Sequence, residues 1–369
     1  MGSYDFYSEY EIENPRDVVK LTKGEGKFSE IEDKYSRIEL LTNALSNDDL
    51  KPFAQTGALT GKFRTKYKHY EGDGGLKRIT HGSSDYDNYA SQQFEIMKEI
   101  GLIKRDPLLD CLLKGSFFLK LEFTLERPFL STDDVSLYII DNPVRKEKVF
   151  KVPMISPMSW KGNLRNAMVR IFLRDQAELS NEEFAKARLN LSLLFGTEKG
   201  VEDDTSLTQY VRMLKPNAHL LYIKYLRNWF DRPEDKPLPH SAGRLRFFPT
   251  FFKNIDLMVI NPHDRKTRVG INPIYIEYVP PETRGAFQLS YIPLDLVGKE
   301  DEDIDKCVKR DLEKISKGIN KLFYEYGFSA KSTAGFGTVK PIQEKDVTLI
   351  PESEELKNIL MNSMGVSHG

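Results

Sequence analysis

Asp141 is the residue whose type and neighbours are best suited to chemistry. It opens the run Asp141-Asn142-Pro143-Val144, directly after the apolar Tyr138-Ile139-Ile140. A carboxylate in a loop after apolar residues can accept a proton as a general base or help to hold a hard divalent cation. Asp-Asn-Pro is also a common turn, in which the carboxylate only accepts hydrogen bonds from nearby amides. The residue types leave both interpretations open.

Positive charge gathers in the residues that follow. From residue 141 to residue 174 there are eight Lys or Arg and two acidic residues, whereas the net charge of the whole chain is −1. Ser159, Lys161 and Arg165 fall in the first turns of an expected helix, where amide groups and the helix dipole attract phosphate. A capped helix with an ordinary cationic surface has the same composition. The segment therefore predicts either a phosphate site or a solvated surface.

A second stretch suited to phosphate lies near the C-terminus. Gly335 and Gly337 let the backbone adopt positive φ and approach a phosphate closely, and Lys331 and Ser332 precede them. A tight turn after a long helix requires the same glycines, so both interpretations remain.

A third stretch combines a turn with positive charge. Asn261-Pro262-His263-Asp264 is typical of a turn, and three basic residues follow it, namely Arg265, Lys266 and Arg268. The pattern predicts an exposed basic hairpin or a solvated loop.

The elements that must position these residues alternate between strands and helices. Residues 117–125 alternate like a half-buried strand. Residues 159–172 and 304–326 repeat apolar residues at helical spacing, and further strands are expected at 244–252, at 287–294 and near Thr338. This order predicts an α+β fold of ferredoxin-like, RRM-like type, an antiparallel sheet with two helices on one face.

The chain divides into a core and additions to it. We expect the core at residues 113–349, with an insertion at about 197–240 and an exposed hairpin at about 258–280. Residues 350–369 are expected to be a C-terminal tail. Residues 1–112 are expected to be an extension of mixed helix and strand, whose role the sequence does not show.

Composition argues against several classes of protein. The 369 residues are 40% hydrophobic and 30% charged, which is typical of a globular protein. No apolar run approaches the roughly 18 residues of a membrane span. The N-terminus has no basic stretch followed by an apolar one, so we expect no secretory signal. Cys111 and Cys307 are isolated and the six histidines lack metal spacing, which argues against a zinc site or a disulfide framework. We therefore expect a cytoplasmic protein without a membrane partner.

Two weaker patterns lie in the extension. Gly24-Glu25-Gly26-Lys27 lacks the length of a P-loop and the strand before it. Residues 62–69 alternate and predict a strand with one basic face, formed by Lys62, Arg64, Lys66 and Lys68. That face suits an extra RNA contact or an ordinary polar surface.

Four short groups of residues occur in an order that is more specific than any one of them. They are Ile140-Asp141-Asn142-Pro143-Val144 with residues 155–165; Leu194-Phe195-Gly196 with residues 243–247; residues 260–267 with residues 277–283; and residues 333–339. Across about residues 113–345 the sequence resembles the RAMP superfamily of CRISPR proteins. It is most similar to the repeated backbone subunit of type III effector complexes. Residues 1–112 have no counterpart in this resemblance.

The resemblance implies a protein that holds a guide RNA by its backbone, so that base pairing alone reads the target. The implied guide contacts are Ser159, Lys161, Arg165, Lys331, Ser332, Gly335 and Gly337. The basic hairpin with Arg265, Lys266 and Arg268 would be a thumb that wedges between bases of the guide–target duplex. The family usually has a basic residue before the Gly-aromatic-Gly run, where this chain has Ala334.

In cleaving members of the family, an Asp occupies the position of Asp141, which implies cleavage of target RNA. A kinked RNA places a 2′-hydroxyl in line with the next phosphate, and the carboxylate takes the proton or helps to hold Mg²⁺ recruited mainly by the RNA. Asp133 and Asp134 are alternatives in the same loop, and no further metal ligands can be named. The implied partners are guide RNA, single-stranded target RNA and other CRISPR effector subunits.

Two other functions stay open. The chain can be a non-catalytic structural or end-capping subunit of the same kind of complex. It can also be a stand-alone endoribonuclease that processes guide precursors. That class typically has a His near the start of the fold and two ferredoxin-like halves, and neither is evident here.

Overall fold

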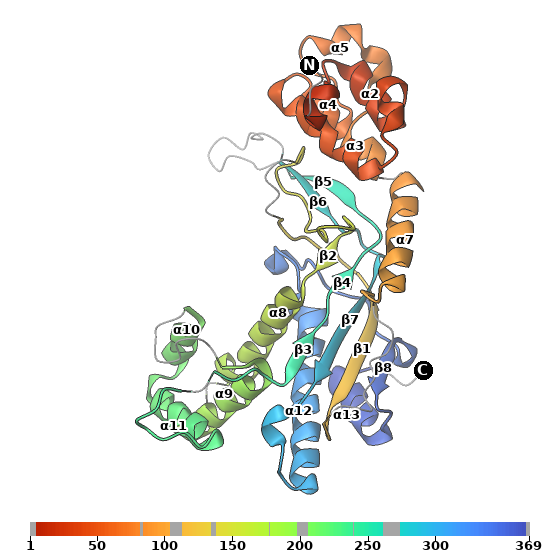
Figure 1. The fold of residues 1–369 in the computed structure, drawn as a ribbon. Helices are drawn as coiled ribbons and strands as arrows, with labels where there is room; N and C mark the ends of the chain where they lie inside the picture. Colours follow the sequence, from red (N-terminus) through yellow and green to blue (C-terminus); the bar gives the residue numbers. More distant parts are fainter. Residues whose placement is uncertain are drawn as a thin grey trace.

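The computed structural model describes residues 5–81, 84–103, 113–133, 138–176, 178–197, 206–238, 240–260 and 274–366. Its parts follow one another along a long molecule, with the N-terminal helices at one end and the main sheet with its helices at the other (Figure 1).

The main sheet has four antiparallel strands in the order β3–β7–β1–β8. The strands are β1 (Phe117–Thr124), β3 (Leu245–Phe247), β7 (Arg284–Tyr291) and β8 (Val347–Ile350). β1 and β7 pair along their whole length, from Phe117 opposite Tyr291 to Thr124 opposite Arg284. Because side chains alternate along a strand, every second residue of β1 from Phe117 to Phe123 belongs to the core.

Two helices pack against one face of this sheet, α8 (Pro157–Val169) and α12 (Asp301–Lys321). The indole of Trp160 on α8 is fully buried, and its ring centroid lies 4.9 Å from that of Phe287 on β7. The indole Nε1–H donates to the Thr250 hydroxyl at 2.9 Å, so the buried donor is satisfied. The expected α+β architecture is confirmed.

The strand expected at 244–252 is two strands. β4 (Thr250–Phe251) leaves the main sheet and pairs with β2 (Met154–Ile155), just ahead of α8. Pro249 separates β3 from β4, and proline cannot donate to a ladder. The strand expected near Thr338 is a single bridge between Leu125 and Val339, and β8 is the last strand.

Residues 350–369 contain a helix that packs on the core. In α13 (Glu354–Met364), Leu360, Met361 and Met364 are buried, and the helix lies against α12. The Asn320 side chain on α12 donates to the Met364 carbonyl at 2.6 Å. The described part of this segment, up to residue 366, is therefore not a free tail.

The described part of the N-terminal extension contains helices joined by loops and no strand, so the expected mixture of helix and strand is wrong there. Residues 62–69 are not a strand, because Phe63 and Tyr67 meet at helical i,i+4 spacing with ring centroids 5.7 Å apart. The helices are α1 (Phe6–Glu9), α2 (Pro15–Lys23), α3 (Lys34–Leu40), α4 (Lys51–Thr56), α5 (Phe63–Lys66), α6 (Leu76–Thr80) and α7 (Ser84–Glu99). We call residues 5–81 the N-terminal unit, because they share a hydrophobic core of their own.

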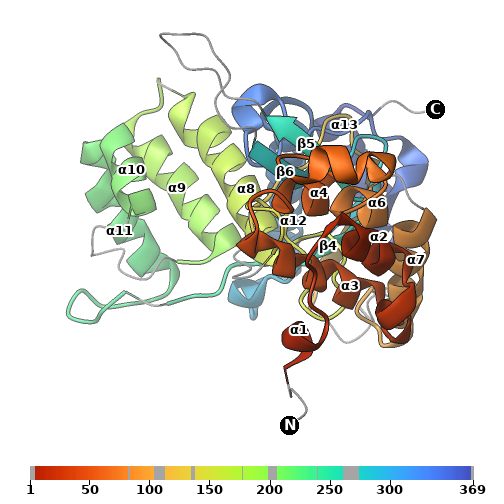
Figure 2. The ribbon, with the colours of Figure 1, turned by 90° about the horizontal axis from the view of Figure 1, so that it is seen from above.

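Two additions flank the core. α9 (Asn181–Phe195) leads to α10 (Ser206–Leu214) and α11 (His219–Trp229), which lie on one side of the molecule (Figure 2). The ends of the stretch 197–240 meet, since the Thr197 amide donates to the Ser241 carbonyl at 3.0 Å. β5 (Asp256–Ile260) and β6 (Ile274–Tyr278) form an antiparallel pair within the expected hairpin.

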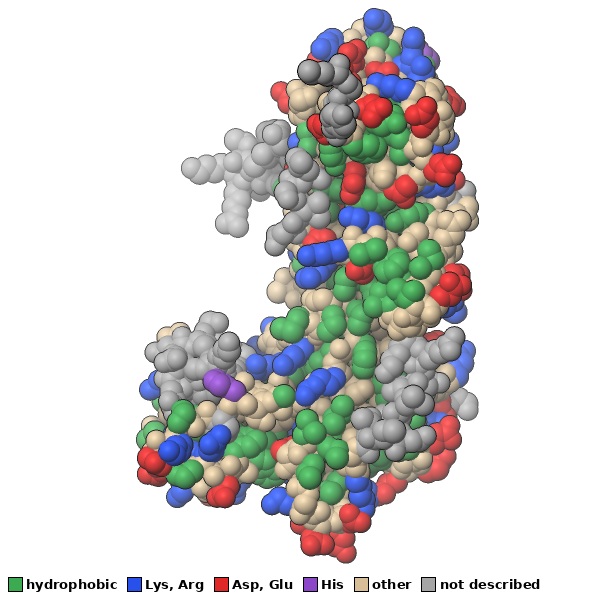
Figure 3. All heavy atoms as spheres, viewed as in Figure 1, with side chains coloured by type: hydrophobic (Ala, Val, Ile, Leu, Met, Phe, Trp, Pro, Cys, Tyr) green, Lys and Arg blue, Asp and Glu red, His purple; other side chains and the backbone are tan. Residues whose placement is uncertain are grey.

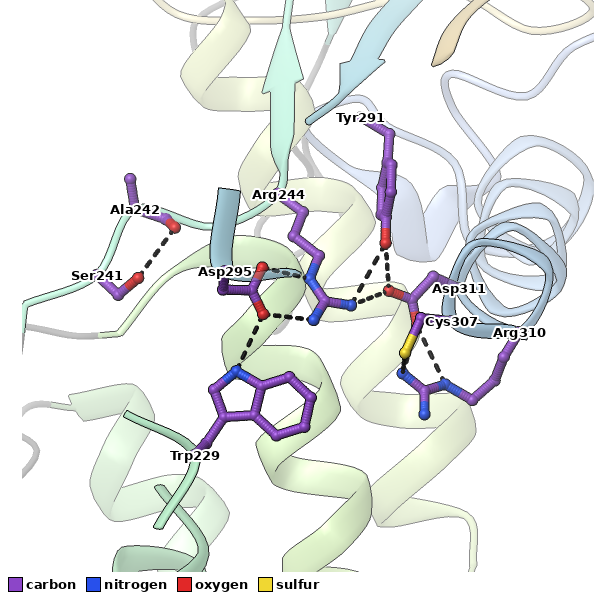
Figure 4. A network of polar contacts seen from close by, with 9 residues as sticks. All are labelled: Trp229, Ser241, Ala242, Arg244, Tyr291, Asp295, Cys307, Arg310 and Asp311. Carbon is purple, nitrogen blue, oxygen red and sulfur yellow. Dashed lines mark hydrogen bonds and ion pairs between the residues drawn. The ribbon is translucent and has the colours of Figure 1, made fainter. Parts of the chain in front are cut away.

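A buried charged network joins the sheet, α12 and α11. Arg244, only 1% exposed, pairs with Asp311 of α12 and with Asp295 (Figure 4). The Tyr291 hydroxyl donates to Asp311 at 2.9 Å, and the Trp229 indole N–H donates to Asp295 at 3.0 Å. A buried guanidinium needs such partners because desolvation of an uncompensated charge is costly.

This network predicts a large stability effect at Asp311. Asp311→Ala leaves the buried Arg244 with Asp295 as its remaining carboxylate, and we expect the free energy of unfolding to fall by about 3 kcal/mol. Glu313→Ala is the control on the same helix, because Glu313 pairs with Lys317 on the surface; its effect should stay within about 0.5 kcal/mol. Urea denaturation measures both, and equal effects of the two substitutions would contradict the assigned role.

Candidate nucleic-acid interface

The start of α8 is capped by its own residues. The Ser156 hydroxyl accepts from the Ser159 amide at 3.2 Å, and the Trp160 amide donates to the Ser156 carbonyl. Pro157 has no amide hydrogen. Within the described residues, Met158 thus has the one first-turn amide without a partner. Binding of a phosphate here would therefore depend mainly on side chains and the helix dipole.

The side chains at this helix start form a cationic cluster. Burial, followed by the nearby Arg165 and Arg246 charges, lowers the pKa of Lys161 below its usual value. Lys161 is half-buried, and no carboxylate of the described residues pairs with it. Like charges held together cost stability in the free protein and favour an anion between them. We call Lys161, Arg165 and Arg246 the α8 cation cluster.

Sequence reasoning missed Arg246. It lies on β3, more than eighty residues after Lys161, and its guanidinium donates to the Gly243 and Leu245 carbonyls. Two basic residues, Arg244 and Arg246, stand at the start of the strand expected at 244–252, and only the packing of α8 against β3 shows which one joins Lys161. The signal available in the sequence was the run Gly243-Arg244-Leu245-Arg246 itself.

The glycine loop, residues 327–338, lies beside α8. The Asn163 side chain of α8 donates to the Phe328 carbonyl at 3.2 Å, and the Trp160 and Phe328 rings are 4.7 Å apart. The loop is also tied to the residues after β1, because the Gly337 amide donates to the Pro128 carbonyl. The structure therefore brings the two predicted guide contacts together on neighbouring elements.

The two glycines of this loop differ in what they require. Gly337 has φ +75°, and a Cβ there would lie 2.6 Å from the Ser329 Cβ, so the turn itself needs glycine. Gly335 also has a positive φ, but a Cβ there would meet nothing within 4 Å. Lys331 is exposed in left-handed conformation, and Ser332 opens a short 3₁₀ turn. The open face of the loop thus lies at Lys331 to Gly335.

The Asp141 carboxylate is exposed, at 74%, and lies 4.0 Å from the Lys51 ammonium. It does not cap the following turn, because the Val144 amide donates to the Glu277 carboxylate instead. No hydrogen bond from a described residue reaches the Asp141 carboxylate in the structure. Asp133 is used differently, since its carboxylate accepts from the Lys146 amide at 3.2 Å.

A buried carboxylate holds the chain on both sides of Asp141. Glu277 of β6 is fully buried and accepts from the Tyr138 hydroxyl at 2.7 Å, from the Val144 amide at 3.2 Å and from the Lys146 ammonium at 2.5 Å. The Glu277 amide donates to the Asn142 carbonyl at 3.0 Å. Burial and the Glu277 charge raise the pKa of Tyr138. We call Glu277, Lys146 and Tyr138 the Glu277 anchor.

A cavity of about 310 Å³ lies beside this segment and is lined by Pro143, Arg145, Lys148 and apolar residues such as Phe251. Arg145 and Lys148 are exposed and have no ion-pair partner among the described residues. Figure 3 shows a hollow on the side of the molecule between the N-terminal unit and the α9–α11 part, with Lys and Arg side chains along its wall.

The residues present do not form a resident metal site. No group of three or more His, Cys, Asp or Glu within the described ranges is arranged to hold a metal ion. Asp141 offers a single carboxylate, so Mg²⁺ recruited by RNA stays a prediction. Of the other predicted residues, Arg265, Lys266, Arg268 and Asp134 lie outside the described residues. None of the described helices is long and apolar enough to cross a membrane.

Comparisons with known proteins agree with the sequence resemblance at the level of the family. The RAMP superfamily profile matches residues 72–340, and the chain belongs to this superfamily. The match begins inside the stretch 1–112, before the expected core. A search of curated proteins finds no match.

Two solved structures are similar to the chain. One is a chain of the type III-B Cmr-beta complex bound to cognate target RNA, with 14% identity and a TM-score of 0.40; the match covers 88% of this chain and 96% of that chain. The other is a chain of a CRISPR RNA-guided surveillance complex in a pre-nicking state, with 10% identity and a TM-score of 0.30, covering 56% and 72%.

The Glu277 anchor predicts a local change in mobility. Glu277→Ala removes the acceptor of the Val144 amide and leaves the Lys146 ammonium buried without its carboxylate. We expect hydrogen exchange of the Val144 amide to accelerate at least about tenfold, because local opening costs less free energy. Glu282→Ala, which removes an exposed pair with Lys340, is the control and should leave that amide unchanged. Unchanged protection of Val144 in Glu277→Ala would rule the anchor out.

Proposed function

We propose that this chain is a subunit of a CRISPR type III effector complex that binds the guide RNA backbone and cleaves the paired target RNA. The observation that carries the proposal is the α8 cation cluster, on a helix that contacts the glycine loop, in a member of the RAMP superfamily. Guide RNA, single-stranded target RNA and other effector subunits are the partners that this function requires.

The guide-binding part follows from charge and geometry. Lys161, with which no carboxylate of the described residues pairs, lies on the helix that contacts the glycine loop. Such a cation suits a ribose-phosphate chain held without regard to base identity. Arg244 and Lys146 are each buried and paired with a carboxylate, so their charges stabilise the fold. Lys161, in contrast, is available to RNA, although the net charge of the chain is only −1.

The cleavage part follows from the environment of Asp141. Its carboxylate is exposed, free of capping bonds and held on a segment that the Glu277 anchor fixes. Such a carboxylate is suited to accept a proton from a 2′-hydroxyl brought in line with the next phosphate. The cavity beside Pro143, with Arg145 and Lys148 at its wall, offers room and positive charge for the neighbouring nucleotide.

Guide binding should weaken when the α8 cation cluster loses a charge. For Lys161→Ala and Arg246→Ala we expect weaker binding of guide RNA of any sequence, and a slope of log K against log salt reduced by about 0.7 per lost phosphate contact. Lys161→Ala should leave folding unimpaired, because it relieves repulsion among like charges, whereas Arg246→Ala also removes hydrogen bonds to the Gly243 and Leu245 carbonyls. The measurement is a salt titration of RNA binding by fluorescence anisotropy.

The matched control is Lys317→Ala, which removes an exposed lysine that pairs with Glu313 on α12. It should change neither the affinity nor the salt slope. An equal loss in all three variants would show that binding depends on net charge alone, against the assigned surface.

Cleavage should depend on the Asp141 carboxylate. In the assembled complex, Asp141→Asn should retain guide loading and target binding while the rate of target cleavage falls by at least about 100-fold. The rate is measured in single-turnover assays with end-labelled target. Cleavage at the wild-type rate at every site would refute the role of Asp141 and favour a non-catalytic subunit.

The same cleavage assay tests whether the reaction requires Mg²⁺. If RNA recruits Mg²⁺, chelation should stop cleavage, whereas the free protein should bind no Mg²⁺ in calorimetry. Asp133→Asn is the control for the neighbouring carboxylate and should keep cleaving, because Asp133 is engaged by the Lys146 amide.

A further inference from the structure

The N-terminal unit contains the segment that leads into Asp141. Tyr138, Ile139 and Ile140 are all buried, and they belong to the hydrophobic core of the N-terminal unit and not to the core of the main sheet. The last three residues before the proposed base are therefore packed inside a separate helical unit. A segment that is packed in this way has little freedom to move against that unit.

One face of α4 contacts both ends of this segment. Lys51 and Gln55 are four residues apart and so lie on the same side of the helix. The Gln55 side chain is 3% exposed and donates to the Ile139 carbonyl at 2.9 Å. The Lys51 ammonium lies 4.0 Å from the Asp141 carboxylate. Between them, the two side chains span the backbone from Ile139 to Asp141.

The two contacts differ in what they do for folding. Gln55 satisfies a buried carbonyl, whose loss of a partner is costly. Lys51 and Asp141 are exposed, at 34% and 74%, and pairs of this kind contribute little to stability. The ammonium is therefore available to a ligand that approaches Asp141, and α4 keeps it there.

We propose that α4 is part of the cleavage site, with Gln55 as a positioning residue for Asp141 and Lys51 as a contact for the scissile phosphate of the target RNA. This inference depends on the proposed cleavage by Asp141. An ammonium a few ångströms from the base can neutralise the charge that develops on the non-bridging phosphate oxygens.

The step balances with these groups and water. The 2′-oxygen forms a bond to phosphorus while the bond from phosphorus to the 5′-oxygen breaks. The 2′-hydroxyl proton passes to the Asp141 carboxylate, and the leaving 5′-oxygen takes a proton from water. The hydroxide formed then takes the proton from Asp141, which regenerates the carboxylate and the water. The products are a 2′,3′-cyclic phosphate and a 5′-hydroxyl end. Lys51 remains protonated throughout and acts only by its charge.

The test uses full-length protein assembled with guide RNA. Lys51→Ala should lower the single-turnover rate at saturating target by about 10- to 100-fold, with the target dissociation constant and the melting temperature unchanged. Lys51→Arg keeps the charge and should restore most of the rate. Lys34→Ala is the matched control, since Lys34 forms a similarly exposed pair with Asp85 in the same helical region; it should cleave like wild type.

Gln55→Met tests the positioning role, because methionine has nearly the same volume but cannot donate to the Ile139 carbonyl. The expected result is a lower maximal rate with an unchanged target dissociation constant. The effect on rate should exceed that of Thr56→Ala, because the Thr56 hydroxyl bonds the Pro52 carbonyl within α4. A role in folding alone would lower the amount of complex and leave the rate of the remaining complex as it is.

The outcomes separate the two proposals. If Asp141→Asn stops cleavage but Lys51→Ala and Gln55→Met cleave at the wild-type rate, the assignment of α4 is wrong and the proposed function stands. If Asp141→Asn still cleaves, both the assignment of α4 and the cleavage part of the proposed function are wrong. If Lys51→Ala weakens target binding without changing the maximal rate, Lys51 is a binding contact and its proposed action on the scissile phosphate fails.

Discussion

The buried carboxylate of Glu277 is the contact on which the geometry around Asp141 depends. The carboxylate accepts from the Tyr138 hydroxyl before Asp141, from the Val144 amide after it and from the Lys146 ammonium. The backbone amide of Glu277 donates to the Asn142 carbonyl. Because Glu277 belongs to β6, the same residue joins the expected hairpin to the segment of the proposed base. A buried ion pair is weak evidence for stability, but with every partner satisfied it can specify one arrangement.

Charge is distributed in this protein according to burial. Lys146 and Arg244 lie in the interior and pair with carboxylates, whereas Lys161 is half-buried near Arg165 and Arg246 and pairs with no carboxylate of the described residues. Burial and then like charges lower the pKa of Lys161, so its charged form is unfavourable until an anion binds. The near-zero net charge of the chain therefore says little about RNA binding. The local positive charge of the α8 cation cluster is the quantity that matters.

The sequence predicted the elements of the core better than their ends and partners. Alternation in residues 117–125 and helical spacing in residues 159–172 and 304–326 identified β1, α8 and α12, because each has one face in a large core. Short segments were less predictable: residues 62–69 fit both a strand and a helical turn, and only the packing of Phe63 decides. Lys161 and Asp141 stood out by local pattern. Arg246, Glu277 and Lys51 did not, since each acts through residues distant in sequence.

The N-terminal unit explains how an exposed turn can hold a reactive carboxylate in place. The main sheet reaches the Asp141 segment only indirectly, through β6 and the residues that follow β1. Proton transfer requires the base to stay within hydrogen-bond reach of a hydroxyl, and small misplacements are costly. Burial of Ile139 and Ile140 in a second core fixes the segment from the opposite side, so that Asp141 is exposed between two rigid parts. If Asp141 is the base that we propose, the N-terminal unit bears directly on cleavage, because it holds the residues that precede this carboxylate.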